Sequence, residues 1–286
     1  MKIGNRTFED KGKTYIMAIL NVTPDSFSDG GKYNDVDRAL IRCERLIDEG
    51  ADIIDIGGES TRPGYTPVGD DEELRRIIPV IEQIKSKFDI PVSVDTYHSR
   101  VAREAAYAGA DLINDIWGLK FEGNTEPMAD IVKQTDTSVC IMHNSVNTIP
   151  AADGAGAYDC GMVPAGIDSV IEGINESVGM ALEAGIGRDR IMIDPGVGFA
   201  KDYYMNMAVT ANLDRFNNMG FPVLLGTSGK SLIGITLDLP VGERLEGTVA
   251  TSVMAVMYGC SYVRVHNVKS NKRAIMMAEE LLKYRI

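Results

Sequence analysis

The chain has 286 residues, with 44% hydrophobic and 24% charged side chains, a formal net charge of -12 and a pI of about 4.8. This composition is typical of a folded protein. The negative charge argues against nucleic acid or an anionic membrane as a partner, since each requires a basic surface. No signal peptide or membrane-spanning run is recognisable, and the four cysteines have no CxxC spacing. We therefore expect a cytoplasmic protein with reduced thiols rather than disulfides or a zinc site.

Apolar, β-branched runs alternate with amphipathic segments along the chain. The runs predict strands at Tyr15–Val22, Asp52–Gly58, Pro91–Thr96, Leu112–Ile116, Ser138–His143, Ile191–Pro195, Val223–Ser228 and Tyr262–Asn267. The amphipathic segments predict helices at Asp37–Glu49, Asp71–Lys87, Ser99–Ala108, Pro127–Lys133, Val163–Ala184, Tyr203–Met219, Glu243–Tyr258 and Asn271–Tyr284. Glycine follows the last turn of several of these helices (Gly50, Gly109, Gly185, Gly220 and Gly259), where it is a common cap.

Eight strand–helix pairs in a chain of this length predict an α/β fold, a single (β/α)8 TIM barrel that spans residues 1–286 as one domain. The nearly continuous apolar strands support this fold, because they indicate a sheet buried on both faces. An open, doubly wound sheet is the alternative. Residues 3–14 precede the first strand and are expected to form a short β-hairpin that closes the bottom of the barrel.

Polar residues follow nearly every predicted strand. In a barrel of this kind the active site lies at the carboxyl ends of the strands. The polar residues there are Asn21, Asp25, Ser60, Thr61, Arg62, Asp95, Asn114, His143, Asp194, Ser228, Lys230, Ser231, Arg264 and His266. One aspartate at a strand end is more often a helix cap than a ligand, but a set drawn from nearly all strands indicates a site.

Three of these residues share one chemistry. Asp95, Asn114 and Asp194 are short hydrogen-bonding groups on three strands. A carboxylate accepts from a paired amino group and ring N–H, and an amide both donates and accepts. Together they suit a flat heterocycle rich in N–H donors.

A second group is cationic. Arg62, Arg264 and His266 suit phosphate or carboxylate oxygens, and Lys230 adds its charge at the start of a predicted helix. The alternative is that Arg264 and His266 form an ion pair with Asp55 inside the barrel. We favour anion binding, because no nearby pattern requires that pair.

Two long segments then carry a resemblance to a known family. Residues 21–31 (NVTPDSFSDGG) and 55–64 (DIGGESTRPG) resemble the signature loops of dihydropteroate synthase. Shorter matches follow in the expected order at residues 93–96, 114–115, 142–143, 194–199, 230–231 and 264–266. The resemblance extends from about Tyr15 to the C-terminus.

This resemblance implies a (β/α)8 barrel, usually dimeric, that uses magnesium. Members of the family condense 6-hydroxymethyl-7,8-dihydropterin pyrophosphate with para-aminobenzoate, which gives 7,8-dihydropteroate and pyrophosphate for folate biosynthesis. The resemblance also implies that the chain is a candidate sulfonamide target.

Matching positions imply roles for individual residues. The pterin set is Asp95, Asn114, Asp194 and Lys230. The pyrophosphate set is Asn21, Arg62, Arg264 and His266, with Asn21 also at the magnesium ion. The para-aminobenzoate and loop set is Asp25, Phe27, Thr61, Pro63, Phe199 and Ser231. The resemblance assigns catalysis to Lys230, Arg264, His266 and Arg62.

The chain departs from the family pattern at a few positions. Gly229 stands where arginine is usual, Ala200 where glycine is usual and Asn267 where aspartate is common. Two alternative functions stay open. A methyl-tetrahydrofolate–corrinoid methyltransferase would share the barrel and the pterin pocket, but it has no need of Arg62, Lys230 or Arg264. A catalytically silent pterin-binding homologue has only Gly229 in its favour.

Overall fold

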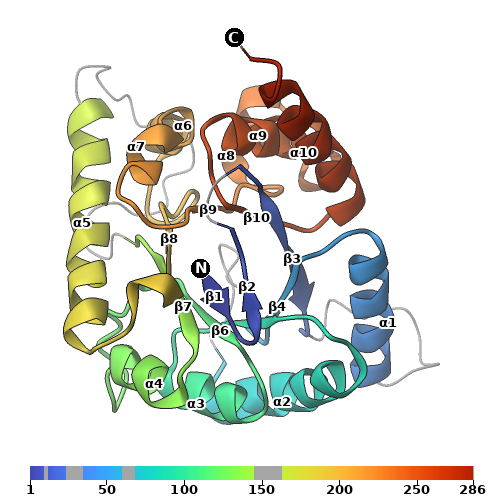
Figure 1. Cartoon of the computed structure of the whole chain (residues 1–286), viewed down its shortest axis with the longest axis vertical. Coiled ribbons are helices and arrows are strands. Elements are labelled where there is room, and N and C mark those ends of the chain that lie inside the picture. The colour runs from blue at the N-terminus through green and yellow to red at the C-terminus, as the bar shows by residue number, and fades with distance from the viewer. Residues whose placement is uncertain (10–11, 24–34, 60–67, 145–162, 286) are drawn as a thin grey trace.

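The protein is a barrel of eight parallel strands surrounded by helices (Figure 1). The computed structural model describes residues 1–9, 12–23, 35–59, 68–144 and 163–285. The strands are β3 (Tyr15–Asn21), β4 (Ile53–Gly57), β5 (Val92–Asp95), β6 (Leu112–Asp115), β7 (Ser138–Met142), β8 (Ile191–Asp194), β9 (Leu224–Leu225) and β10 (Tyr262–Val265). Each predicted strand is present at its expected place.

The sheet follows the order β8-β7-β6-β5-β4-β3-β10-β9. A parallel bridge between Ile193 and Val223 joins its two edge strands, and the Ile193 backbone N–H donates to the Pro222 carbonyl at 2.9 Å. The sheet therefore closes on itself. The predicted TIM-like barrel is confirmed, and the alternative of an open sheet is wrong.

The helices are α1 (Asp35–Asp48), α2 (Asp70–Lys87), α3 (Ser99–Tyr107), α4 (Met128–Thr135), α5 (Val163–Glu183), α6 (Tyr203–Ala211), α7 (Leu213–Asn217), α8 (Ser231–Leu237), α9 (Leu245–Met257) and α10 (Val268–Leu282). The predicted helix Tyr203–Met219 is wrong in one respect, because it is broken into α6 and α7 at Asn212. The backbone of Asn212 is not helical, and its side-chain amide donates to the Ala208 carbonyl at 2.8 Å. A side chain that bonds the local backbone competes with continuation of the helix.

The expected N-terminal hairpin is present, with β1 (Lys2–Ile3) antiparallel to β2 (Arg6–Thr7). In Figure 1 it lies over the centre of the ring of strands. Its apolar side chains pack with inward-facing residues of the barrel strands in one buried cluster: Met1, Ile3, Phe8, Tyr15, Met17, Ile53, Leu112, Cys140, Met192, Leu224 and Tyr262. This end of the barrel is thus apolar and plugged.

The carboxyl ends of the strands contrast with that plugged end. Buried polar side chains lie at these ends: Asp95 and Asp194 are the last residues of β5 and β8, and Asn114 is the next-to-last residue of β6. The barrel therefore has one apolar end and one polar end, and only the polar end offers groups for chemistry. None of the described helices is long and apolar enough to cross a membrane.

Candidate functional site

Strand register aligns four residues at the polar end. Asn21 on β3 is paired with Gly57 on β4, Gly57 with Asp95 on β5, and Asp95 with Asn114 on β6. A side chain at Gly57 would crowd this row, because its Cβ would lie 3.3 Å from Asn21 Oδ1 and 3.8 Å from Asp95 Cβ. The absence of a side chain at Gly57 therefore leaves Asn21 and Asp95 facing each other across β4.

Arg264 on β10 crosses the barrel to two carboxylates. Its Nε donates to Asp55 Oδ2 at 2.6 Å, and its Nη2 donates to Asp95 Oδ2 at 2.6 Å. The Asn114 amide nitrogen lies 3.4 Å from the same Asp55 oxygen. The ion pair between Arg264 and Asp55, which the sequence analysis considered less favourable, is therefore present. Arg264 also pairs with Asp95, which the residue types had assigned to a different group.

His266 does not take part in that ion pair. It is exposed beyond the end of β10, and its Nδ1 lies 3.0 Å from Ser228 Oγ. The two residues predicted to act together therefore differ in environment. Arg264 lies in the floor of the barrel mouth, and His266 lies at the rim.

Asp194 and Lys230 meet next to Gly226, close to the Cβ of Arg264. A Cβ at Gly226 would lie 3.7 Å from Asp194 Oδ2 and 3.8 Å from Lys230 Nζ. Lys230 Nζ donates to the Val197 carbonyl and lies 4.6 Å from the centre of the Phe199 ring. An ammonium from the loop after β9 thus converges with a carboxylate at the end of β8 and an aromatic face from the loop after β8.

The surrounding protein shifts the pKa values of these groups. Burial raises the pKa of Asp194, while Lys230 and the Gly196 N–H act against that shift. Desolvation lowers the pKa of Lys230 to about 8, although Asp194 opposes it. Burial acts to lower the pKa of Arg264, but the carboxylates of Asp55 and Asp95 outweigh it and raise that pKa. Perturbed groups that converge in this way are common in functional sites.

An aromatic cluster borders this mouth. Tyr97, Ile116 and Met142 form its buried part, and the half-buried rings of Trp117, Phe121 and Phe199 pack against them. Trp117 follows β6 and is half-buried. Its ring centre lies 6.1 Å from Tyr97 and 5.4 Å from Phe121, so it belongs to the cluster that includes Phe199.

Sequence reasoning missed two residues of this region. Asp55 was considered only as a possible partner of arginine, yet it accepts from Arg264 and lies at the bottom of the polar layer. Glu59 received no role, but its carboxylate accepts from the Val68 N–H at 2.8 Å and from the Tyr97 hydroxyl at 2.9 Å. The available signal was an acidic residue directly after Gly57-Gly58 at the carboxyl end of a predicted strand.

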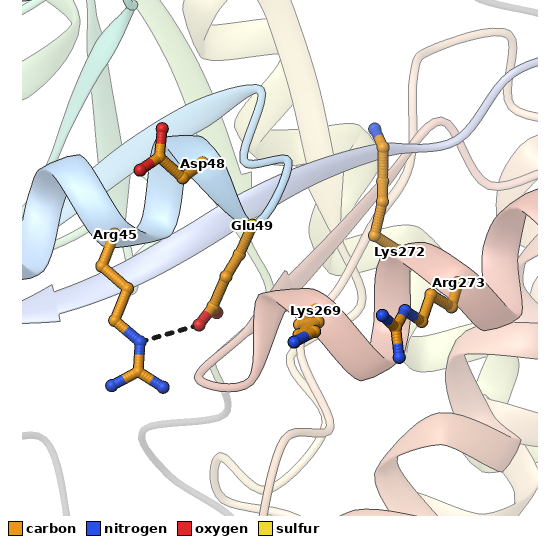
Figure 2. Close-up of a pocket in the computed structure, with 6 residues that line it drawn as sticks. All are labelled: Arg45, Asp48, Glu49, Lys269, Lys272 and Arg273. Carbon is orange, nitrogen blue, oxygen red and sulfur yellow. Dashed lines mark hydrogen bonds and ion pairs between the residues drawn. The ribbon is translucent and has the colours of Figure 1, made fainter.

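A second hollow, of about 380 Å³, lies outside the barrel between α1 and α10 (Figure 2). Its lining is charged: Arg45, Asp48, Glu49, Lys269, Lys272 and Arg273. Within it Arg45 pairs with Glu49 at 2.9 Å, and Lys272 pairs with the neighbouring Asp52 at 3.1 Å. It contains none of the strand-end residues, so we place the candidate site at the barrel mouth.

Comparison with known proteins agrees with this geometry. A family profile described as "Pterin binding enzyme" matches residues 17–266. The dihydropteroate synthase of Clostridium beijerinckii is 48% identical over 284 residues, which is 99% of this chain and 100% of that protein. This chain belongs to the dihydropteroate synthase family. Its activity is therefore that of a transferase of folate biosynthesis.

Solved structures of the dihydropteroate synthase family have the same fold. The Clostridium difficile enzyme, determined in the presence of pteroic acid, has a TM-score of 0.86 and 45% identity, covering 96% of this chain and 99% of its own. The Xanthomonas albilineans enzyme with 4-aminobenzoic acid has a TM-score of 0.84 and 39% identity, and the match covers 94% of this chain and 93% of that chain. The barrel architecture is thus shared over nearly the full length.

Five of the residues that the dihydropteroate synthase resemblance singles out lie outside the described residues: Asp25, Phe27, Thr61, Arg62 and Pro63. Ser231 is described and is exposed at the start of α8.

The backbone conformation bears on two of the three departures from the dihydropteroate synthase pattern: it favours glycine at both positions, which this chain has at 229 but not at 200. Ala200 has φ +45°, a left-handed conformation that favours glycine. Gly229 has φ +67°, and a Cβ there would meet open space. Asn267 caps α10 by accepting from the Ser270 N–H at 3.0 Å, a bond that aspartate also makes.

Proposed function

We propose that the dihydropterin ring lies at the barrel mouth between Asp194 with Lys230 on one side and the row of Asp95 and Asn114 on the other. One observation supports this placement above all. Asp194 Oδ1 is occupied by the Gly196 N–H at 2.7 Å, while Oδ2 faces Gly226 next to Lys230. An ionised carboxylate has several lone pairs, so Asp194 can also accept the paired N–H groups of a pterin. This site binds the first substrate.

We propose that Arg264, His266, Asn21 and Arg62 bind the pyrophosphate of the ester. Two of the five N–H groups of Arg264 donate to Asp55 and Asp95, so three remain for an anion. The two carboxylates hold the guanidinium in one orientation before substrate arrives, and preorganised charge is most effective in a site from which water is excluded.

Asn21 fits a role at magnesium, because its amide oxygen lies in the half-buried last position of β3. Within the described residues, no group of three or more His, Cys, Asp or Glu side chains could hold a metal ion. Mg²⁺ in such sites is bound largely by substrate phosphates and water, with few protein ligands. When bound, the ion would stabilise negative charge on the pyrophosphate.

The reaction breaks the bond between the pterin methylene carbon and the bridging pyrophosphate oxygen, and it forms a bond from that carbon to the amine nitrogen of para-aminobenzoate. The electron pair of the broken bond leaves with the pyrophosphate, and the amine loses one proton. Arg264 and His266 stabilise the charge that grows on the leaving group. The dihydropterin shares positive charge with its methylene, so the protein supplies position and charge rather than a strong general base.

We propose that para-aminobenzoate binds beside Phe199 and Ser231, with Asp25, Phe27, Thr61 and Pro63 completing its site. The Phe199 ring supports this, because it faces Lys230 and belongs to the aromatic cluster at the mouth. An apolar wall beside the pterin suits the aromatic ring of the second substrate.

We also propose that the chain acts as one domain and as a homodimer in the cytoplasm. Exposed apolar side chains support the dimer: Met277 and Leu281 lie four residues apart on α10, and Tyr284 follows in the turn after it. The neighbouring α9 exposes Met254 and Met257. A second copy of the chain would cover such a surface. Three buried free thiols, Cys43, Cys140 and Cys260, suit a reducing compartment.

The test is release of pyrophosphate from the dihydropterin ester, para-aminobenzoate and Mg²⁺. We expect turnover by the wild-type chain, and a loss of about 100-fold or more in the Lys230→Ala and Arg62→Ala variants. Lys120→Met is the control, because Lys120 pairs with Glu176 on the surface. No release by the wild type would favour a silent pterin-binding protein. Pterin binding without Mg²⁺-dependent pyrophosphate binding would favour the methyltransferase alternative.

A further inference from the structure

Lys201 is a buried lysine that the proposed mechanism does not use. It lies at the end of the loop between β8 and α6 and is 9% exposed. Its Nζ donates to three backbone carbonyls, those of Gly196 at 2.9 Å, His143 at 3.2 Å and Phe199 at 3.2 Å. An ammonium group has three N–H donors and no acceptor. The donors of Lys201 therefore match the three carbonyls one to one.

These contacts connect Lys201 to the pterin side of the mouth. His143 follows β7, whereas Gly196 and Phe199 belong to the loop after β8, so one side chain ties two strand ends together. The same loop contains Val197, whose carbonyl accepts from Lys230, and Phe199, whose ring faces Lys230. A change at Lys201 would reach the substrate site through this loop.

The loop is held from its other side by α6. Asn206 Oδ1 accepts from the Gly198 N–H at 2.6 Å, and its amide donates to the Lys201 carbonyl at 3.0 Å. The loop also includes Ala200 in a left-handed conformation. Unfavourable backbone conformations persist only where surrounding contacts impose them. The contacts that hold this loop come from Asn206 and from Lys201, and only Lys201 contributes a charged group.

We propose that Lys201, as an ammonium ion, is a positioning residue of this enzyme: it fixes the 195–201 loop so that the Val197 carbonyl and the Phe199 ring hold Lys230 in place for the pterin. The part of this inference that concerns the pterin rests on the proposed function. The part that concerns the loop does not.

The charge of Lys201 also makes the loop sensitive to pH. Burial lowers the pKa of Lys201 to about 7, and Lys230 adds to this shift while Asp194 opposes it. The neighbouring His143 is neutral in the same range, because burial and the charge of Lys201 lower its pKa to about 3. A neutral amine keeps only two donors and gains an acceptor, so one carbonyl loses its partner as pH rises through 7.

Binding of 6-hydroxymethylpterin, measured by calorimetry, tests the role of Lys201. We expect Lys201→Met to retain the wild-type circular dichroism spectrum and to bind the pterin at least tenfold more weakly at pH 6. The wild-type affinity should fall relative to that of the variant between pH 6 and 7.5, because Asp95, whose pKa burial raises to about 7, titrates in both proteins. The control Lys120→Met removes an ammonium that donates to the half-buried Gly173 carbonyl on α5, and it should bind within twofold of wild type. A folded Lys201→Met protein with wild-type affinity overturns the proposal.

Hydrogen exchange of the wild-type protein provides a second test that needs neither a variant nor a ligand. After correction for the intrinsic effect of pH, we expect peptides that cover residues 195–201 to lose protection between pH 6 and 8, while peptides from α10 do not. If the Lys230→Met variant shows the same loss of protection between pH 6 and 8, titration of Lys230 is not its cause. Constant protection of residues 195–201 overturns the proposal even if Lys201→Met fails to fold. If the wild type binds no pterin but the loop still responds to pH, the proposed function fails and the loop contact stands.

Discussion

The Nη2 atom of Arg264 lies 2.6 Å from Asp95 Oδ2, so the residue expected at the pyrophosphate and a residue expected at the pterin form one ion pair. Asp95 is 7% exposed and Arg264 is 17% exposed at their side chains. The two binding regions are thus joined by a shared pair, to which Asp55 adds a second carboxylate. A change in one region is expected to affect the other.

Replacing Arg264 should affect both stability and activity. Arg264→Met removes the guanidinium that bonds Asp55 and Asp95, and breaking a buried pair on one side costs about 3–5 kcal/mol. We expect the free energy of unfolding to fall by that order in urea denaturation, and pyrophosphate release to be lost. His266→Ala is the matched change at the rim, and it should weaken pyrophosphate binding with little change in stability, because His266 is exposed. Equal stability losses in both variants would contradict this division.

The pH dependence of turnover should report Lys230. Its pKa is about 8 in the folded protein, against an ordinary value of 10.5, so activity that requires the ammonium should fall as pH rises through 8. Between these two values the unfolded chain binds more protons, and the contribution of this group to the free energy of unfolding therefore rises with pH. Activity should fall while stability does not.

The measurement is the pH profile of kcat/KM from pH 6 to 10, alongside urea denaturation at each pH. Lys230→Arg is the control, since its guanidinium stays charged throughout. The limb near pH 8 should disappear in this variant, while pH dependence near pH 7, where Lys201 and Asp95 both titrate, remains. A limb near pH 8 that persists in Lys230→Arg belongs to another group.

Ala200→Gly should stabilise the protein. The left-handed conformation of Ala200 costs about 1–2 kcal/mol for a residue with a Cβ, whereas glycine loses about 0.5–1 kcal/mol through its greater freedom when unfolded. We therefore expect a gain of roughly 0.5–1 kcal/mol by denaturation. Ala106→Gly, in the last turn of α3, is the control and should lose up to about 1 kcal/mol. A loss of stability in Ala200→Gly would show that the left-handed conformation of Ala200 costs less free energy than the added freedom of glycine in the unfolded chain.

The proposed dimer is tested by placing a charge in the apolar stripe of α10. Leu281 is 59% exposed, and Leu281→Glu should convert the dimer to a monomer in light scattering, because a carboxylate would be buried without a partner. Tyr107→Glu on α3 changes another exposed apolar residue and should leave the dimer intact. A wild-type protein that is monomeric at micromolar concentration would remove the dimer proposal.

Most of the fold could be predicted because strands buried on both faces are short apolar runs and the helices between them are amphipathic. The break at Asn212 could not, since it depends on whether one amide bonds to the Ala208 carbonyl or to solvent. Closure of the barrel was an inference from the number of strands, and only the bridge between Ile193 and Val223 established it.

The sequence by itself determined which polar residues stand at the strand ends and in what order, because a parallel strand delivers its last residues to one end of the barrel whatever its neighbours are. Only the tertiary structure decided how those residues are partnered. Arg264 lies 209 residues from Asp55 and 169 from Asp95 along the chain, and no local pattern connects them. Lys201 has an unremarkable place in the sequence. Its role follows from three carbonyls that converge when β7 and β8 become neighbours. A buried ammonium requires such hydrogen-bond acceptors in place of water, and they come from segments that are distant in the sequence.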